Sequence, residues 1–319
     1  MADVATLIRS LKENTTYFGE SKVFLVGGSY SGLMVPWFAK LYPSLIDLGW
    51  ASSAPVRFKT EFWEFYANVF KLILKIGGKE CHSHITKGFD TLKAEIDKHD
   101  LKELIEMNIC GFDHTNDSYV FNLFEILTRV IGTLVQDENI QKACDEISRT
   151  SFASYLKKEL HGDSTKCYDS VSSLESLKDI HYTTDSARLW LYQCCSELGN
   201  FKTSKYVPRD FWLDMCTDVF GHTFSFCYIN RKVKKTDRNF QDMESNESFR
   251  RVFLTQPELD AWSVTKVRKH NRTYILEGAT HCEDLEKSTK NDKPSIKILK
   301  MDIDFEVQKL QNSHQPIIN

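Results

Sequence analysis

A single serine stands among glycines at the end of an apolar run. Residues 24–34 read FLVGGSYSGLM, with Ser29 directly after two glycines. A serine on a sharp strand-to-helix turn forms a nucleophile elbow, whose crowded backbone accepts only small neighbours. The small neighbours here are Gly27, Gly28, Ser31 and Gly32. The pattern predicts that Ser29 is a nucleophile and that the backbone N–H of Tyr30 faces a developing oxyanion.

The same glycines allow a second interpretation, a phosphate-binding turn at the start of a helix. The segment has neither the lysine of a P-loop nor the G-x-G-x-x-G spacing of a dinucleotide site, and both absences count against that interpretation. The strict elbow pattern is G-x-S-x-G. Here Ser31 occupies its last position, and Gly32 follows one residue later.

A serine nucleophile needs a general base, and the base needs a carboxylate that orients it. Asp260 follows the apolar stretch RRVFLTQ, and His281 follows the stretch RTYILEG. The order Ser, Asp, His is the one found in α/β-hydrolases, where the last two residues lie on loops after late strands. We therefore predict a triad of Ser29, Asp260 and His281.

A metal site is the alternative use of histidine in this chain. His82 and His84 lie in the segment CHSHI, but no matching set of further ligands accompanies them. The nine cysteines contain no CxxC pair, which argues against a zinc ribbon. We expect neither a metal nor a cofactor.

The elbow lies inside a strand–helix–strand unit. Residues 22–28 and 45–54 are predicted strands, and the apolar spacing of 30–42 between them is helical. Pro43 ends that helix. A unit of this kind predicts a parallel sheet with covering helices, the α/β class.

The predicted secondary structure changes twice in the rest of the chain. Helical patterns dominate from about Phe58 to Thr236, and eight of the nine cysteines lie there. The polar stretch 233–248 is predicted to be a loop. Short strands return at 250–256 and 272–278, before a last helix over about Pro294–Gln311.

Composition excludes several classes of protein. The chain has 319 residues, 41% hydrophobic and 27% charged, with a net charge of −3. This is a globular composition with no sign of nucleic-acid binding. No uninterrupted apolar run reaches the roughly 18 residues of a membrane helix, so we expect no membrane span. The N-terminal stretch has the pattern of an amphipathic helix rather than of a signal peptide.

Cysteines and sequons nevertheless point to the secretory pathway. Widely spaced cysteines suit disulfides in an oxidising compartment. Four Asn-x-Ser/Thr sequons are glycosylation candidates. They begin at Asn14, Asn116, Asn246 and Asn271.

Several stretches resemble one family of serine peptidases, that of prolylcarboxypeptidase, dipeptidyl peptidase II and thymus-specific serine protease. The stretch GGSYSGLMVPWFAKLYPSLIDLGWASSAPV is similar to the family's active-site region. ELDAWS resembles the L-D-P-W around the family's catalytic Asp, GATHCEDL its A-H-C or A-H-H, and WLYQCCSELG its W-x-Y-Q-x-C-x-E-x-G. The thymus-specific branch fits best, and the resemblance covers essentially the whole chain.

The resemblance implies a fold and a set of roles. It implies an α/β-hydrolase core interrupted by a helical cap, with core parts at 1–57 and 237–319 and the cap at 58–236. Ser29 matches the nucleophile, Asp260 the acid and His281 the base. The family's cap disulfides imply the pairs Cys81–Cys144, Cys110–Cys167 and Cys195–Cys216, which leave Cys194, Cys227 and Cys282 unassigned.

The family also implies an activity and a location. Its members cleave short peptides near proline at one terminus, by an acyl-enzyme mechanism. They work in lysosomes, in endosomes or outside the cell, and some are homodimers. The partners expected here are peptide substrates.

Two departures from the family affect these expectations. Only about 21 residues precede the elbow strand, whereas the family has a long segment there that includes a signal peptide and supplies a second oxyanion donor. We therefore expect an N-terminally truncated chain with an exposed sheet edge. QPELDAWS also replaces N-G-x-L-D-P-W around Asp260, and Ser31 replaces the commoner glycine.

Three functions follow as alternatives. The first is a serine exopeptidase, with amino- or carboxyl-terminal cleavage undecided. The second is a catalytically impaired relative that binds peptides or partners. The third is an esterase, which shares the triad but not the family's segments around Asp260 and His281.

Overall fold

The structure is a computed structural model that describes residues 1–14, 16, 18–136, 139–181, 186–241, 247–265 and 272–312. The chain divides into two compact units. One combines Met1–Arg57 with Asp237–Asn319, and the other is Phe58–Thr236. The first will be called the sheet unit and the second the helical unit.

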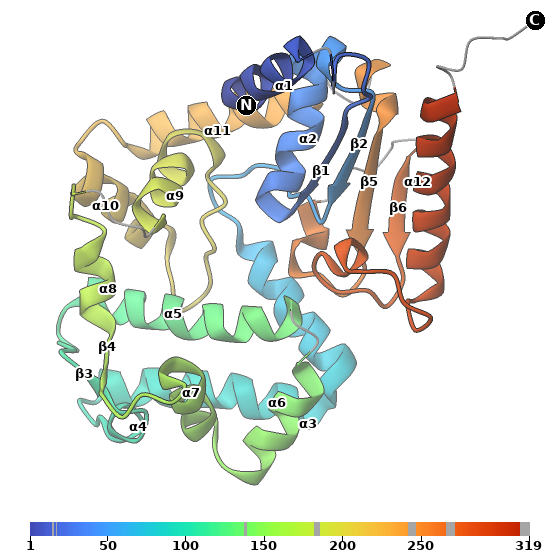
Figure 1. Ribbon diagram of the computed structural model, residues 1–319. Helices are drawn as coiled ribbons and strands as arrows, with labels where there is room; N and C mark the ends of the chain where they lie inside the picture. Colours follow the sequence, from blue (N-terminus) through green and yellow to red (C-terminus); the bar gives the residue numbers. More distant parts are fainter. Residues whose placement is uncertain are drawn as a thin grey trace, which may run out of the picture. The chain divides into compact units, whose positions relative to one another are not determined.

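The sheet unit is built on four strands in the order β1-β2-β5-β6 (Figure 1). These strands are β1 (Phe24–Gly28), β2 (Leu48–Ser52), β5 (Val252–Pro257) and β6 (Thr273–Leu276). Every pairing between them is parallel, which confirms the predicted α/β class. β2 is shorter than the predicted 45–54 at both ends: the 3-10 turn η1 (Pro43–Leu45) lies before it, and Ser53, with φ of +49°, follows its last residue.

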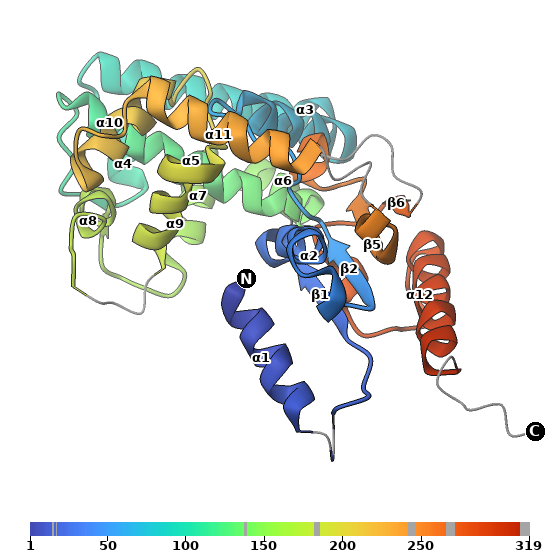
Figure 2. The same cartoon turned by 90° about the horizontal axis from the view of Figure 1, so that it is seen from above.

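Two helices cover opposite faces of this sheet (Figures 1 and 2). They are α2 (Ser29–Leu41) and α12 (Pro294–Asn312). Successive side chains of a strand point to opposite faces. Leu48 of β2 therefore packs in a buried cluster with Ile296 and Leu299 of α12, whereas a side chain at Gly49 would meet Val35 of α2.

β1, the strand that leads into the elbow, lies at an edge of the sheet. Among the described strands it pairs with β2 alone. Its Phe24 and Val26 are 36% and 46% exposed. Helix α1 (Ala2–Glu13), which precedes β1, buries Ala5 and Ile8. The described residues thus leave apolar side chains of β1 in contact with solvent.

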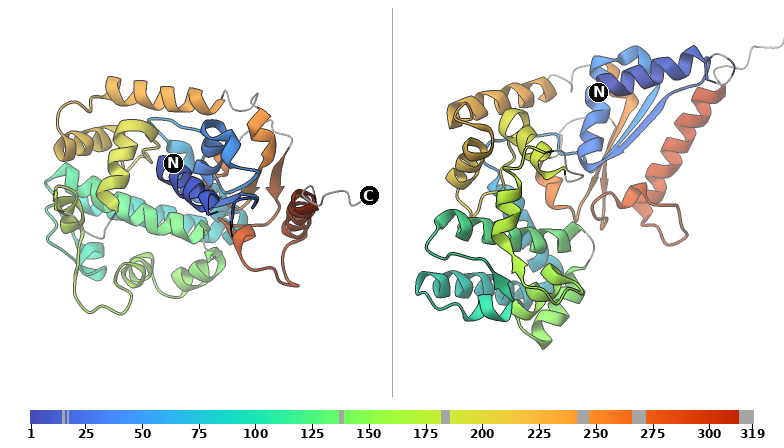
Figure 3. Two further views of the ribbon diagram at one scale, coloured as in Figure 1. Left: turned by 45° about the horizontal axis from the view of Figure 1, so that its top comes forward. Right: turned by 60° about the vertical axis from the view of Figure 1, so that its left-hand side comes forward.

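The helical unit contains most of the helices (Figure 3). Those that lie wholly within it are α3 (Trp63–Asp97), α4 (Lys102–Glu106), α5 (Asp117–Gln136), α6 (Ile140–Arg149), α7 (Phe152–His161), α8 (Ser170–Ser176), α9 (Ala187–Gln193), the π-helical turn η2 (Cys194–Leu198) and α10 (Arg209–Phe220). A short parallel pair, β3 (Ile109–Cys110) and β4 (Tyr168–Asp169), lies among them. α3 bends at Gly78, whose φ of +80° is not helical.

Aromatic side chains form much of the core of the helical unit. Phe89 of α3 and Phe124 of α5 are fully buried. Tyr206 stacks on both rings, with centroids 5.3 and 5.0 Å away. Phe152 of α7 meets Phe89 edge-on. This cluster ties three helices to the segment that precedes α10.

Three disulfides link elements of the helical unit. They are Cys81–Cys144, Cys110–Cys167 and Cys195–Cys216, the pairs that the family resemblance implies. Cys194, Cys227 and Cys282 are free thiols. Burial raises the pKa of the Cys194 thiol to about 12, so this thiol stays protonated at neutral pH.

The predicted loop over 233–248 is wrong for its first half. Helix α11 spans Phe226–Gln241. Ile229 and Val233, four residues apart, are buried on one face of this helix, while its other positions are mainly polar. The polar composition of the segment therefore reflects a solvated helix face rather than a loop. Residues 247–251 form a 3-10 turn, η4, ahead of β5.

By length and composition, α5 could cross a membrane, with a mean hydropathy of 1.3 over 18 residues. However, 61% of that window is buried inside the structure. Core helices pass the same test, and α5 carries buried residues such as Leu123, Leu127 and Ile131 that pack within the helical unit.

Candidate active site

The elbow is a tight turn between β1 and α2. Ser29 is the first residue of α2 and has φ of +55°. A non-glycine residue in this left-handed region is strained, and such strain is typical of functional turns. The turn presents Ser29 at the carboxyl end of β1, the edge of a parallel sheet where ligands bind.

Close backbone approaches explain two of the glycines. A Cβ at Gly27 would lie 2.4 Å from the carbonyl oxygen of Ser31, and one at Gly32 would lie 2.5 Å from that of Ser52. Real Cβ atoms do not approach backbone this closely. Gly27 therefore lets the turn close on itself, and Gly32 lets α2 pack against β2.

Ser31 supports the turn with its own side chain. Its Oγ accepts a hydrogen bond from the N–H of Gly28 at 3.1 Å and donates one to the carbonyl of Gly28 at 2.7 Å. A glycine at this position could make neither bond. Tyr30, the second residue of α2, contributes its N–H to the first helical turn, where an oxyanion donor is expected.

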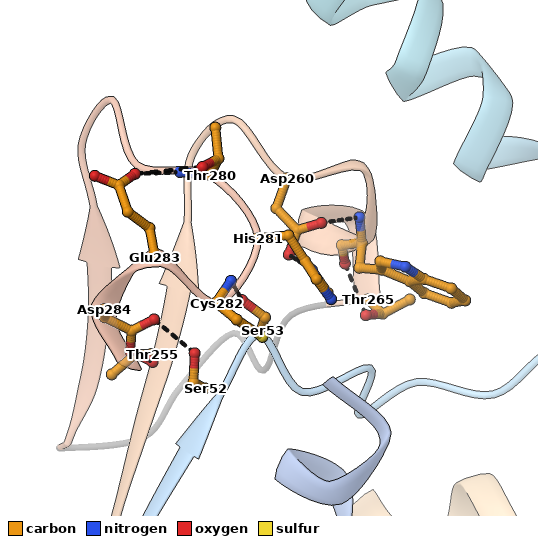
Figure 4. A network of polar contacts seen from close by, with 11 residues as sticks. Ser52, Ser53, Thr255, Asp260, Thr265, Thr280, His281, Cys282, Glu283 and Asp284 are labelled. Atoms are coloured by element: carbon orange, nitrogen blue, oxygen red, sulfur yellow. Dashed lines mark hydrogen bonds and ion pairs between the residues drawn. The ribbon is translucent and has the colours of Figure 1, made fainter. Parts of the chain in front are cut away.

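Asp260 and His281 come together at the ends of β5 and β6. Nδ1 of His281 lies 2.8 Å from Oδ2 of Asp260 (Figure 4). Asp260 is 1% exposed, and its Oδ1 accepts a hydrogen bond from the N–H of Trp262 at 2.9 Å. The loop that departs from the family's N-G-x-L-D-P-W pattern thus still holds the carboxylate in a defined position.

The electrostatics of His281 result from opposing effects. Burial by itself would lower the pKa of the imidazole. The hydrogen bond and charge of Asp260, together with a contact to Cys282, outweigh burial and raise that pKa above its ordinary value near 6.5. The carboxylate therefore stabilises the imidazolium that would form when this ring accepts a proton.

The histidine loop packs directly against the elbow. A side chain at Gly28, the residue before Ser29, would meet Leu285 Cδ1 at 2.7 Å and Cys282 Sγ at 3.0 Å. The structure contains no hydrogen bond between Ser29 and His281, both of which are described. Catalytic hydrogen bonds often form fully only in the substrate complex. The structure thus brings Asp260 and His281 into contact and places the His281 loop beside the turn that carries Ser29.

The other candidate residues belong to other elements of the chain. His82 and His84 are in α3, and no group of three potential metal ligands occurs among the described residues. Asn14 is exposed at the end of α1. The side chain of Asn116 accepts a hydrogen bond from the N–H of Ser118. Asn246 and Asn271 lie outside the described residues.

Sequence reasoning missed the groups beneath the histidine loop. Asp284 is fully buried and receives hydrogen bonds from Ser52, Thr255 and Trp50. Ser53 accepts a hydrogen bond from the N–H of Cys282. The paired serines at the end of a predicted strand were the available signal, but only the fold shows what they bind.

The chain is similar in sequence to known serine proteases and carboxypeptidases. The family model for serine carboxypeptidase S28 matches residues 1–303. Human thymus-specific serine protease is 24% identical over 97% of this chain and 67% of its own length. Lysosomal Pro-X carboxypeptidase of Bos taurus is 32% identical over 29% of this chain and 19% of its own length. A relative from Caenorhabditis elegans is 25% identical over 89% of this chain, which spans 61% of that relative.

Proposed function

Because the chain belongs to the serine carboxypeptidase S28 family, we propose that it is a serine-type exopeptidase whose triad is Ser29, Asp260 and His281. One observation carries the proposal. The buried Asp260 contacts His281 at 2.8 Å, on a loop that packs against Gly28, next to the strained Ser29. The proposed base, its orienting carboxylate and the turn of the proposed nucleophile all belong to the sheet unit.

The chemistry is acyl transfer in two halves. Ser29 Oγ attacks the scissile carbonyl carbon while His281 takes its proton, and the Tyr30 N–H stabilises the oxyanion. The tetrahedral intermediate collapses to an acyl-enzyme as His281 returns the proton to the leaving amine. Water then repeats the sequence, and the peptide's new carboxyl end leaves.

The substrate class is a short peptide cut near proline. The names of two relatives bear on this part of the proposal: the second, a Pro-X carboxypeptidase, supports cleavage near proline, and the first, a thymus-specific serine protease, supports only the serine-protease class. Cleavage at the carboxyl end, as the second name states for that protein, is tested with proline-containing peptides whose amino or carboxyl terminus is blocked. Loss of cleavage on blocking one end identifies the terminus that is recognised.

We place the protein in the secretory pathway. Three disulfides in the helical unit support this location, because such bonds persist in oxidising compartments. The lysosomal location in the name of one relative agrees with it. Enzymatic deglycosylation of protein from secretory cells is expected to reduce its apparent mass. A homodimer stays a prediction, which light scattering tests.

A non-catalytic peptide-binding protein is the second candidate. It is favoured by the lack of a hydrogen bond between Ser29 and His281 in the described structure. In that case Asp260 and His281 would keep their contact, but Ser29 would not be activated.

A fluorophosphonate probe separates the two candidates, because it reacts only with an activated serine. The proposal expects labelling of the folded chain and none of Ser29→Ala. The matched control is Ser44→Ala, which removes an exposed serine from η1 and should leave labelling unchanged. Folded protein that stays unlabelled while still binding a proline-containing peptide would establish the non-catalytic alternative.

A further inference from the structure

A buried carboxylate lies under the histidine loop and takes no part in the triad. Asp284 is 0% exposed. Its Oδ1 accepts a hydrogen bond from Ser52 Oγ at 2.6 Å. Its Oδ2 accepts bonds from Thr255 Oγ1 at 2.5 Å and from Trp50 Nε1 at 3.1 Å. Figure 4 shows Asp284 between the ends of two strands and the loop that carries His281.

The donors to Asp284 belong to the rigid part of the fold. Trp50 and Ser52 are on β2, and Thr255 is on the neighbouring strand β5. A carboxylate buried without partners would be strongly unfavourable, whereas one that receives three hydrogen bonds is held in place. Asp284 therefore joins the loop to two strands at a single point, three residues after His281.

A further hydrogen bond holds Cys282, the residue after His281. The N–H of Cys282 donates to Ser53 Oγ at 2.9 Å. Both residues are in the left-handed region, with φ of +59° for Cys282 and +49° for Ser53. Non-glycine residues keep such conformations only where the surroundings enforce them. The loop backbone next to His281 is thus held in a strained conformation by a hydrogen bond to the residue that follows β2.

The far side of the loop is tied as well. Glu283 accepts a hydrogen bond from the N–H of Thr280 at 2.9 Å. It also pairs with Lys293 at 2.5 Å. His281 consequently lies between Thr280 and Cys282, whose backbone N–H groups both donate hydrogen bonds to side chains. Asp284 provides the hydrogen bonds that connect the loop to the strands of the sheet.

We propose that Asp284 is a positioning residue, which holds the His281 loop against β2 and β5 so that the imidazole keeps its contact with Asp260 beside the Ser29 turn. This inference rests on the proposed function and adds a residue to it. Asp284 touches neither the substrate nor the reacting atoms in this scheme. It acts through the loop, and Ser52 and Thr255 are its partners in that role.

The chemistry of the three donors indicates which substitutions are informative. Asn in place of Asp284 can keep one oxygen for Trp50 and Thr255, but its NH2 group then faces Ser52, whose hydroxyl must turn to accept. Ala removes all three acceptor contacts and leaves the buried hydroxyls of Ser52 and Thr255 and the half-buried indole N–H of Trp50 without this acceptor. The effect should therefore rise from Asp284→Asn to Asp284→Ala.

The test measures the rate constant for fluorophosphonate labelling as a function of pH. A misplacement of about 1 Å at a catalytic group can cost on the order of a hundredfold in rate. We expect a loss of about tenfold for Asp284→Asn and about a hundredfold for Asp284→Ala. The control is Glu286→Gln, an exposed carboxylate two residues further on, which should label at the wild-type rate.

A second readout follows His281 itself, by NMR titration of its ring, assigned by comparison with His281→Gln. The groups that face this ring are the Asp260 carboxylate and the Cys282 thiol. If Asp284 positions the loop, its replacement weakens the contact with Asp260 and lowers the pKa of His281. Loss of folded protein alone would reduce the signal without moving that pKa. Ser52→Ala serves as a milder variant if Asp284→Ala does not fold.

The outcomes separate this inference from the proposed function. Suppose that the wild-type protein labels, and that Asp284→Asn and Ser52→Ala both keep its labelling rate and its His281 pKa. That result would overturn the positioning role and leave the proposed triad unaffected. A wild-type chain that does not label, but whose His281 pKa falls in Asp284→Asn, would overturn the peptidase proposal and keep the positioning role.

Discussion

Replacement of Gly32 by alanine tests the close packing that sets the elbow. A Cβ at this position would lie 2.5 Å from the carbonyl oxygen of Ser52 and 3.0 Å from that of Gly27. Alanine favours the helix over glycine by about 1 kcal/mol. Overpacking costs about 1–3 kcal/mol, and the upper value applies because both contacts are with backbone rather than with flexible side chains. The expected net loss of stability is therefore about 2 kcal/mol.

Urea unfolding followed by hydrogen exchange provides the assay. The exchange is read on peptides that cover β1, α2 and β2, so that the sheet unit is followed separately. The midpoint should fall with an unchanged slope, because the surface exposed on unfolding stays the same. The labelling rate should fall as well, since α2 carries Ser29 as its first residue.

Gly132→Ala is the matched control. Gly132 is also a helical glycine, in α5, but a Cβ there would meet the Phe65 ring at 3.5 Å, an ordinary contact. This variant should be neutral or more stable by roughly 0.5–1 kcal/mol. Equal effects of the two substitutions, or a stable and fully reactive Gly32→Ala protein, would refute the packing argument.

Further predictions concern charge and cross-links. Asp260→Asn removes the group that raises the pKa of His281. The increase of the fluorophosphonate labelling rate with pH should therefore occur at lower pH, while the maximal rate falls by a factor on the order of 10⁴. An increase at the wild-type pH would contradict the pairing of Asp260 with His281. Because the pKa of His281 is raised in the folded state, this residue stabilises the fold fully below about pH 6.5, and its contribution is lost as the pH rises through the folded pKa. Chemical denaturation at a series of pH values should show this fall in the free energy of unfolding for the wild type. The fall should be absent in His281→Gln. Removing the disulfide Cys110–Cys167, which spans 57 residues, should lower the free energy of unfolding by about 4 kcal/mol. Removing Cys195–Cys216, which spans 21 residues, should lower it by about 3 kcal/mol, because the shorter loop restricts the unfolded chain less. The reverse order in denaturant titrations would show that chain entropy is not the dominant effect.

The elements with strong local signals were predictable from the sequence. The apolar run before Ser29, the helical spacing after it and Pro43 together indicate strand, helix and stop, and the structure has β1, α2 and η1 there. The parallel sheet follows from short strands separated by helices. The residues of the proposed triad were selected by order and motif, and the structure adds the 2.8 Å contact between Asp260 and His281.

Local patterns misled where the environment of a segment decides its structure. The stretch that contains Val233 is mostly polar, which favoured a loop. Its helix depends on the burial of Ile229 and Val233, a property of the neighbouring elements rather than of the segment's own composition.

The sequence by itself determined which groups can react and in what order the chain presents them, because strand, turn and helix signals are local. Only the tertiary structure decided how those groups are held. Ser52 and Asp284 are 232 residues apart in the chain and form a 2.6 Å hydrogen bond. The paired serines at the end of a strand are the only local sign of Ser52, and no local pattern marks Asp284, since the partner of a buried carboxylate is chosen by packing across the sheet. The support beneath His281 therefore appears only when β2, β5 and the histidine loop are brought together.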